Sequence, residues 1–65
     1  MDYTEKQFFD ELRRLLNILY NKNLTQTQIG ILLGVTDRCV RKWERNESSP
    51  SGFIFAKLQK LCKEN

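Results

Sequence analysis

The stretch that decides the fold lies in the middle of the chain, where residues 26–45 read QTQIGILLGVTDRCVRKWER. Gly30 stands at its fifth position and Gly34 at its ninth. Two helices joined by a turn of about three or four residues approach closely only if a small side chain faces the crossing, and a glycine supplies the positive φ of the turn. The apolar side chains that would fill the wedge between the helices are Ile29, Leu33, Val35, Val40 and Trp43. The spacing predicts a helix-turn-helix over about residues 25–45, against the alternative of a helical hairpin from a repeat or bundle fold.

Capping signals define the first helix of this pair. Thr25, followed three residues later by Gln28, has the spacing of a capping box, in which two side chains satisfy free backbone N–H groups at the helix start. Gly34 adopts the left-handed conformation without a Cβ clash, so it is a natural helix stop. We therefore expect a short helix that begins after Thr25 and ends at Leu33.

The second helix of the pair carries a cationic face. Thr36 is a suitable N-cap, and Val40 and Trp43 are spaced as inward-facing side chains. Burial tendencies favour Trp43 as a core residue over a role in base stacking. The side chains left on the opposite face are Asp37, Arg38, Arg41, Lys42 and Arg45. Four of these five are basic, so we expect this helix to present positive charge.

Helices are also predicted on both sides of the pair. Before it, apolar residues at helical offsets predict an amphipathic helix from about Thr4 to Tyr20, with Thr4 and Gln7 as its capping box. The inward stripe of that helix comprises Phe8, Leu12, Leu15, Leu16 and Leu19. After the pair, residues 46–52 read as a loop, and a last helix follows. Its apolar stripe comprises Ile54, Leu58, Leu61 and Cys62.

No alternation of apolar and polar residues competes with these helical periods anywhere in the chain. We therefore predict the fold class as all-α: one compact four-helix domain over residues 1–65 that contains a helix-turn-helix.

The predicted helices carry more aromatic surface than one small core needs. The aromatic residues outside the main stripes are Phe9, Tyr20, Phe53 and Phe55. A chain of this length buries only about 60% of its unfolded surface, so its stability is marginal without support from elsewhere. We expect a homodimer, with these four aromatic residues as candidates for the interface or for the edge of the core.

The composition excludes several classes of function. The 65 residues contain no histidine, and the two cysteines, Cys39 and Cys62, have no further ligand residue at metal-site spacing. No glycine-rich phosphate loop and no nucleophile–histidine pair is present. We therefore expect no enzymatic activity, no metal, no cofactor and no small-molecule ligand. No apolar run approaches the roughly 18 residues of a membrane span, and no targeting signal precedes the first helix, so we expect a cytoplasmic protein without a membrane partner.

Positive charge is concentrated in the middle of the chain. The formal net charge is +3 and the isoelectric point is about 9.1. Residues 1–21 carry a net charge of −1, residues 22–45 carry +3 and residues 46–65 carry +1. A basic isoelectric point and a clustered excess of cations are both features of nucleic-acid-binding domains, although a solvated basic face has the same composition.

Residues 24–46, LTQTQIGILLGVTDRCVRKWERN, followed by Pro50 and Ser51, resemble the Xre/Cro, lambda-repressor-like family of DNA-binding regulators. Together with the flanking helices, the resemblance covers most of the chain. More narrowly, the run from Leu32 to Arg38 with Val40 and Arg41 is similar to small phage autorepressors found beside anti-CRISPR genes. The family resemblance implies a transcriptional regulator that binds an inverted-repeat operator in double-stranded DNA as a homodimer. For this chain it suggests a phage- or plasmid-type repressor of its own operon in a prokaryotic nucleoid.

The resemblance also implies which residues read bases. The family places the second helix of the motif in the major groove with its N-terminal side chains on base edges, and here those are Asp37, Arg38, Arg41 and Lys42. The guanidinium groups of Arg38 and Arg41 match the paired acceptors of guanine. Asp37 has three open roles: accepting from a cytosine amino group, orienting Arg41 four residues on, or stabilising the positive end of the helix dipole.

Phosphate contacts are expected at the ends of the two helices. The start of the first helix offers donors at a positive dipole end, and the residues that follow the second helix would grip the backbone further along. The full set of candidates is Lys22, Thr25, Gln26, Thr27, Thr36, Arg45, Asn46 and Ser48. For Lys22 a free surface lysine is the alternative, and for Cys39, beside this face, a packing role is the alternative to oxidant sensing.

The chain departs from the family at one position. Many members carry an arginine late in the first helix that pairs with the glutamate corresponding to Glu44, whereas Leu19 stands there in this chain. Arg13 and Arg14 are the remaining candidate partners of Glu44. The rival to the DNA-binding interpretation is an antitoxin-like protein-interaction module with secondary DNA binding, which the surplus of apolar residues favours.

Overall fold

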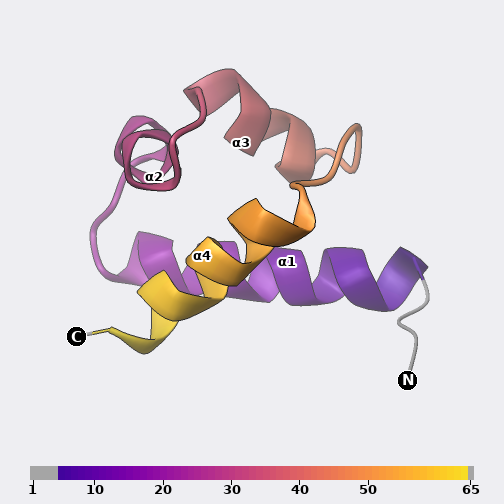
Figure 1. Ribbon diagram of the computed structural model, residues 1–65, viewed down its shortest axis with the longest axis horizontal. Helices are drawn as coiled ribbons and strands as arrows, with labels where there is room; N and C mark the ends of the chain where they lie inside the picture. Colours follow the sequence, from indigo (N-terminus) through magenta and orange to yellow (C-terminus); the bar gives the residue numbers. More distant parts are fainter. Residues whose placement is uncertain (1–4, 65) are drawn as a thin grey trace.

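The computed structural model describes residues 5–64, which form four helices and no strand (Figure 1). The helices are α1 (Glu5–Asn21), α2 (Gln26–Leu33), α3 (Asp37–Glu44) and α4 (Gly52–Lys63). The prediction of an all-α chain with four helices is confirmed. The radius of gyration of 11.0 Å is about that of a compact domain of this length. The expected cap of the first helix, Thr4, lies outside the described residues.

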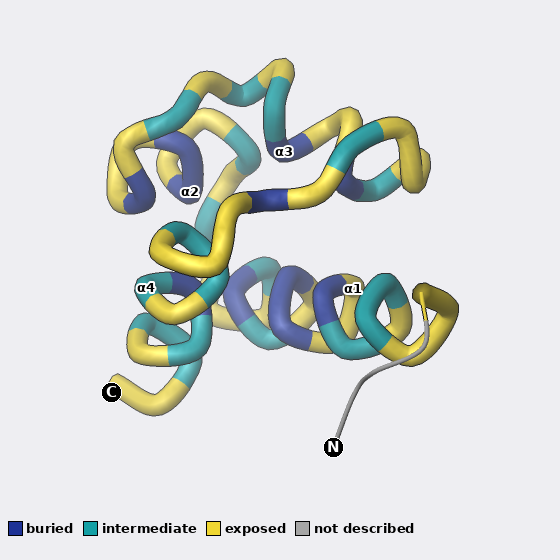
Figure 2. The backbone as a smooth tube through the Cα atoms, turned by 45° about the vertical axis from the view of Figure 1, so that its right-hand side comes forward, coloured by how far each residue is buried: buried dark blue, intermediate teal, exposed yellow. Residues whose placement is uncertain are grey.

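The helices pack around one apolar core to which every helix contributes. α1 lies along one side of the molecule, α2 and α3 lie on the other side, and α4 crosses α1 (Figure 1). The core residues are Leu12, Leu15, Leu16, Leu19, Ile29, Leu33, Val40, Trp43 and Leu58. Figure 2 shows these positions on the sides of the helices that face one another. Trp43 is 4% exposed, so its assignment to the core is confirmed.

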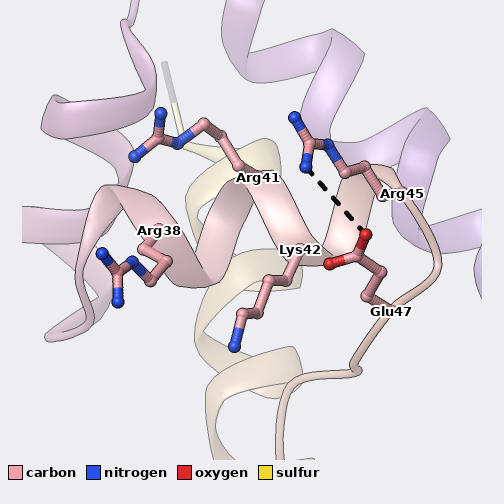
Figure 3. A pocket seen from close by; sticks show the side chains of 5 residues that line it. All are labelled: Arg38, Arg41, Lys42, Arg45 and Glu47. Carbon is pink, nitrogen blue, oxygen red and sulfur yellow. Dashed lines mark ion pairs between the residues drawn. The ribbon is translucent and has the colours of Figure 1, made fainter.

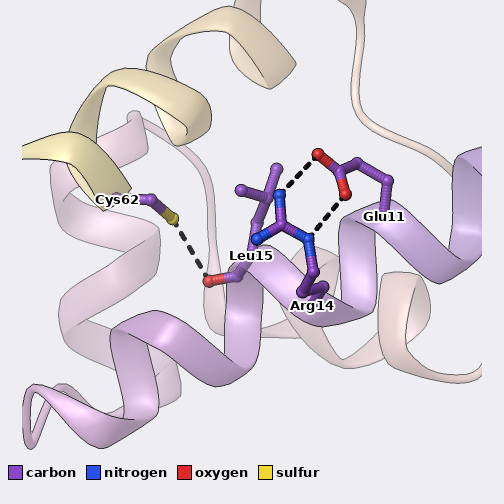
Figure 4. Close-up of polar contacts among 4 residues, drawn as sticks. All are labelled: Glu11, Arg14, Leu15 and Cys62. Atoms are coloured by element: carbon purple, nitrogen blue, oxygen red, sulfur yellow. Dashed lines mark hydrogen bonds and ion pairs between the residues drawn. The ribbon is translucent and has the colours of Figure 1, made fainter.

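Of the two flanking helices, α1 buries its predicted inward stripe more completely than α4 does. Phe8 of α1 is only half-buried, and in α4 the half-buried residues are Ile54, Leu61 and Cys62. Figure 4 shows the Cys62 thiol donating a hydrogen bond to the backbone carbonyl of Leu15 at 3.3 Å. The edge of the core therefore runs along α4.

The capping signals of α2 act as the sequence predicts. The hydroxyl of Thr25 accepts a hydrogen bond from the Gln28 N–H at 3.1 Å, and the Thr25 N–H donates to the Gln28 side-chain oxygen at 2.8 Å. Gly34 has φ of 80°, in the left-handed region, and its N–H bonds back to the last turn of α2. α2 therefore ends at Leu33.

Gly30 lies where α2 meets the start of α3. A Cβ atom at this position would stand 2.7 Å from the carbonyl oxygen of Val35 and 3.1 Å from the carbonyl carbon of Thr36. Backbone atoms cannot move aside as a flexible side chain does. Only glycine therefore allows the close approach of the two helices.

The remaining boundaries also follow local signals. The Thr36 hydroxyl accepts from the Cys39 N–H at 3.3 Å and caps α3, while the Ser51 hydroxyl accepts from the Ile54 N–H at 3.3 Å and caps α4. Gly52 is the first residue of α4, so the predicted loop over residues 46–52 ends one residue too late. The cause is the serine cap, which starts the helix immediately after Ser51.

The four surplus aromatic residues divide between the edge of the core and the surface. The ring centroid of Phe8 lies 5.6 Å from that of Phe9 and 5.0 Å from that of Phe55, and both partners pack against the core. Tyr20 is half-buried against the core as well. Phe53 is 73% exposed. Within residues 5–64 no helix has the length and apolar character needed to cross a bilayer.

Candidate nucleic-acid interface

Four cationic side chains of α3 and the residue after it form one exposed surface, which we call the α3 basic surface. It consists of Arg38, Arg41, Lys42 and Arg45. Together with Glu47 these side chains line an open hollow of about 340 Å³ (Figure 3). The predicted grouping of these four cations is therefore present in the structure.

The core packing of α3 explains why these cations point outward. Val40 is fully buried and Trp43 is 4% exposed, and these two residues are the apolar anchors of the helix. Residues on the other side of a helix must then face the solvent, because side chains repeat about every 3.6 residues. The α3 basic surface is thus a direct consequence of where Val40 and Trp43 pack.

Two weak ion pairs touch the α3 basic surface without neutralising it. A terminal nitrogen of Arg41 lies 3.5 Å from a carboxylate oxygen of Asp37, and Arg45 lies 4.0 Å from Glu47. The Arg41 and Arg45 side chains are still 51% and 71% exposed. Exposed pairs of this kind contribute only about 0–1 kcal/mol, so a polyanion can displace them. Within residues 5–64 neither Arg38 nor Lys42 takes part in an ion pair.

Glu44, at the end of α3, is held by groups from α1 and α2. Its carboxylate accepts from the Tyr20 hydroxyl at 2.5 Å and from the Gln26 side-chain amide at 2.6 Å. Its backbone carbonyl accepts from Arg13 at 3.0 Å. These contacts fix the C-terminal end of α3 against the helices on either side of it.

Tyr20 binds the carboxylate of Glu44, for which the sequence offered Arg13 and Arg14 as candidate partners. Arg13 reaches the backbone of Glu44 but not its carboxylate, and Arg14 forms hydrogen bonds to Glu11 at 2.8 Å (Figure 4). The pKa of Tyr20 is raised to about 12. The main cause is burial, and the hydrogen bond to Glu44 and the negative charge of that carboxylate act in the same direction. The available signal was the hydroxyl of Tyr20, which directly follows Leu19, the residue that stands in place of the arginine of the family.

Lys22 lies apart from the other phosphate candidates. Its ammonium group contacts the carbonyl oxygens of Leu61 at 3.2 Å and of Cys62 at 3.3 Å, and also that of Glu64. These carbonyls are at the C-terminal end of α4, which lies on the opposite side of the molecule from α3 (Figure 1). A cation there stabilises the negative end of the helix dipole, so the expected phosphate role of Lys22 has no support from its position.

The other phosphate candidates border α2 and α3. Gln26 uses its side-chain amide on Glu44, and Thr25 and Thr36 use their hydroxyls as helix caps. Thr27 is exposed at the start of α2. After α3, Arg45 and Asn46 are exposed and Ser48 is half-buried, with Asn46 in the left-handed region at φ of 60°.

Cys39 lies at the border of the α3 basic surface. Its side chain packs partly against the core, and the Thr36 hydroxyl lies 3.5 Å from its sulfur. Hydrogen bonds from Thr36 lower the pKa of the Cys39 thiol. Among residues 5–64 no group of three or more histidine, cysteine or acidic side chains is arranged to hold a metal ion.

Comparison of the chain with protein-family models, with curated proteins and with solved structures found no match. The interpretation of this surface therefore depends on its own geometry and charge.

Proposed function

We propose that α2, the turn over residues 34–36 and α3 form a helix-turn-helix of the Xre/Cro type, and that the protein is a non-enzymatic, sequence-specific DNA-binding regulator in the cytoplasm. The observation that carries this proposal is the α3 basic surface: three exposed cations on one face of α3, which two buried residues anchor, and a fourth directly after the helix. The major groove of B-DNA is about 12 Å wide and admits such a helix.

Within this proposal, Arg38 and Arg41 read guanines through their paired N–H donors, and Lys42 adds a third contact near the base edges. The separation of 3.5 Å between Asp37 and Arg41 supports the role of Asp37 in orienting Arg41 rather than in accepting from cytosine. Arg38 has no such partner within residues 5–64 and is free to adapt to the groove.

The phosphate contacts come from both ends of the motif. Thr25, Gln26 and Thr27 stand at the start of α2, where backbone N–H groups and the helix dipole favour an anion. Thr36 stands at the equivalent end of α3, and Arg45, Asn46 and Ser48 stand beyond its other end. These contacts set the register on the duplex and make the affinity depend on salt, but they carry no sequence information.

The regulator acts as a homodimer on an inverted repeat, with half-sites about 34–36 Å apart. Occupancy of an operator that overlaps the promoter blocks polymerase, which is sufficient for repression. The resemblance to small phage autorepressors favours a phage- or plasmid-type repressor of its own operon.

The decisive experiment compares two double variants on DNA from just upstream of the coding gene. Arg38→Ala combined with Arg41→Ala removes two candidate base contacts, while Lys60→Ala combined with Lys63→Ala removes the same charge from the exposed face of α4. Because each bidentate arginine–guanine contact is worth ~1–3 kcal/mol, we expect the first variant to bind at least about thirtyfold more weakly in a mobility-shift titration. The second variant should bind within about threefold of the unmodified chain.

Equal affinities of the two double variants would contradict the proposal. The alternative function, an antitoxin-like protein-interaction module, is favoured by the exposure of Ile31 and Phe53. Under that alternative, the Arg38 and Arg41 variant keeps its binding to a partner protein, and any DNA binding is weak and insensitive to sequence.

A further inference from the structure

One acidic side chain lies among the cations of the α3 basic surface. Glu47 lines the same open hollow as these four cations, and its carboxylate is directed toward Arg45 (Figure 3). A carboxylate oxygen of Glu47 lies 4.0 Å from a guanidinium nitrogen of Arg45. The Glu47 side chain is 53% exposed, so a molecule that binds to this surface meets a negative charge there. Asp37, which pairs with Arg41, does not line the hollow.

The backbone turn after α3 determines the position of Glu47. Asn46 has φ of 60° and its N–H donates to the carbonyl oxygen of Trp43 at 3.1 Å, while the Glu47 N–H donates to that of Lys42 at 2.9 Å. This pair of hydrogen bonds around a left-handed residue is the Schellman motif, which folds the chain back over the end of a helix. If α3 continued instead, residue 47 would share a face with Val40 and Trp43, which are buried. The left-handed turn at Asn46 therefore places Glu47 with the cations.

A carboxylate at this position offers Arg45 the same interaction as a backbone phosphate. Both groups are oxygen anions that pair with a guanidinium group. The distance of 4.0 Å is too long for a hydrogen bond, so a phosphate can take the place of Glu47 beside Arg45. Glu47 stays attached to the turn, however, and charges closer than about 8 Å still repel one another at physiological ionic strength. A phosphate bound to Arg45 is therefore repelled by the carboxylate that it displaces.

We propose that Glu47 limits the affinity of the α3 basic surface for DNA, because its carboxylate competes with a backbone phosphate for Arg45. Phosphates are the same in every sequence, so Glu47 weakens binding to any duplex by a similar factor. Binding to random sequences depends almost entirely on such contacts, and Glu47 therefore shortens the time that the protein spends on them.

This inference rests on the proposed function for the identity of the polyanion, but it requires neither an operator nor a dimer. Its experiment accordingly uses a labelled duplex of random sequence, whereas the proposed function is tested on DNA from upstream of the coding gene. A chain that binds the random duplex and the upstream DNA equally well would contradict sequence-specific regulation and leave the role of Glu47 intact.

Removal of the Glu47 charge tests the proposal in fluorescence anisotropy titrations of the full-length chain at several salt concentrations. Glu47→Gln keeps the size of the side chain, and we expect it to bind the random duplex at least about threefold more tightly at low salt. The slope of log affinity against log salt concentration should become steeper by up to about 1, because one more phosphate is fully paired. Glu64→Gln removes the same charge from an exposed position at the C-terminal end of α4, far from α3, and should bind within about twofold of the unmodified chain. Glu47 is exposed, so the thermal transition should not change.

A double-mutant cycle with Arg45→Ala distinguishes competition for Arg45 from a general change of charge. Without the guanidinium group there is nothing to compete for, so Glu47→Gln in the Arg45→Ala background should tighten binding no more than Glu64→Gln does. The proposal is overturned if Glu47→Gln and Glu64→Gln bind the random duplex equally well, or if the gain from Glu47→Gln is as large without Arg45 as with it. Binding by the Glu47→Gln variant alone, with none by the unmodified chain, would support the proposal, and no binding by either would overturn it together with the proposed function.

Discussion

At the scale of single residues, the three glycines of the chain have different physical roles. Gly30 leaves room for the backbone at Val35 and Thr36, whereas Gly34 has open space around it but adopts φ of 80°. Gly52 has open space and no positive φ. The first role depends on packing and the second on backbone conformation, so the same substitution should have a different effect at each position.

Substitution by alanine should therefore lower the free energy of unfolding at Gly30 and at Gly34 but not at Gly52. Gly30→Ala should lower the free energy of unfolding by ~1–3 kcal/mol, because the added methyl group meets backbone atoms. Gly34→Ala should lower it by ~1–2 kcal/mol through left-handed strain, and Gly52→Ala should leave it unchanged or slightly higher. Urea denaturation followed by circular dichroism measures all three. A Gly30→Ala variant as stable as Gly52→Ala would contradict the proposed close approach.

Tyr20 is the second residue with an individual role, because its hydroxyl donates to Glu44 across the interface of α1 and α3. The folded chain binds the phenolic proton more tightly than the unfolded chain does, since the pKa of Tyr20 rises from 10.0 to about 12 on folding. The stabilisation is thus complete below pH 10 and is lost as the pH rises from about 10 to about 12.

Removal of this hydroxyl should produce a stability loss that depends on pH. Tyr20→Phe should lower the free energy of unfolding at pH 8 by about 1 kcal/mol, the usual contribution of a hydrogen bond to a partly buried group. The difference from the unmodified chain should shrink between about pH 10 and pH 12, as the phenol of the unmodified chain ionises. Urea titrations of both proteins over this range measure the difference. A difference that stays constant throughout that range would exclude the hydrogen bond as its cause.

At the scale of elements, α2 and α3 are too short to be stable alone. Each has eight residues, and isolated helices shorter than about 12–15 residues are marginal in water. Their stability comes from caps at their ends and from burial against the other helices. The capping box of Thr25 and Gln28 therefore contributes to the stability of the whole domain.

Two threonines at the start of α2 should contribute differently to the stability of the domain. Thr25→Ala should lower the free energy of unfolding by about 1 kcal/mol, because the hydroxyl caps the Gln28 N–H. Thr27→Ala should leave it nearly unchanged, since Thr27 is exposed and alanine favours the helix. Thermal unfolding of both variants under identical conditions is the measurement, and equal stability losses would argue against the capping role.

At the scale of the whole molecule, the formal net charge of +3 is distributed unevenly over the surface. The α3 basic surface holds four cations, whereas Arg14 is paired with Glu11 on α1 and Lys22 contacts the end of α4. A polyanion should therefore orient the molecule with α3 toward it.

The proposed phosphate contact of Arg45 should appear in the salt dependence of DNA binding. Arg45→Ala should weaken binding by a similar factor for all sequences and reduce the slope of log affinity against log salt concentration by about 1. Arg38→Ala should instead relax the preference for guanine at one position of each half-site. Mobility shifts at several salt concentrations, with specific and mismatched duplexes, distinguish the two effects. An unchanged slope for Arg45→Ala would exclude Arg45 as a phosphate contact.

The sequence by itself determined the features that depend on neighbours along the chain. The four helices, their caps at Thr25 and Thr36, the stop at Gly34 and the outward direction of the α3 cations follow from helical periodicity and local hydrogen bonding. These signals act within about two turns of helix. They therefore do not require knowledge of how the helices pack.

Only the tertiary structure decided which groups from different helices meet. The Glu44 carboxylate pairs with Tyr20 rather than with an arginine, Lys22 contacts the end of α4, and Phe53 remains exposed while Phe55 packs at the core. The physical reason is that partners 24 or more residues apart, such as Tyr20 and Glu44, are brought together by the crossing geometry of the helices. Periodicity indicates which side of a helix is apolar, but the positions of the other helices decide which part of that side is covered.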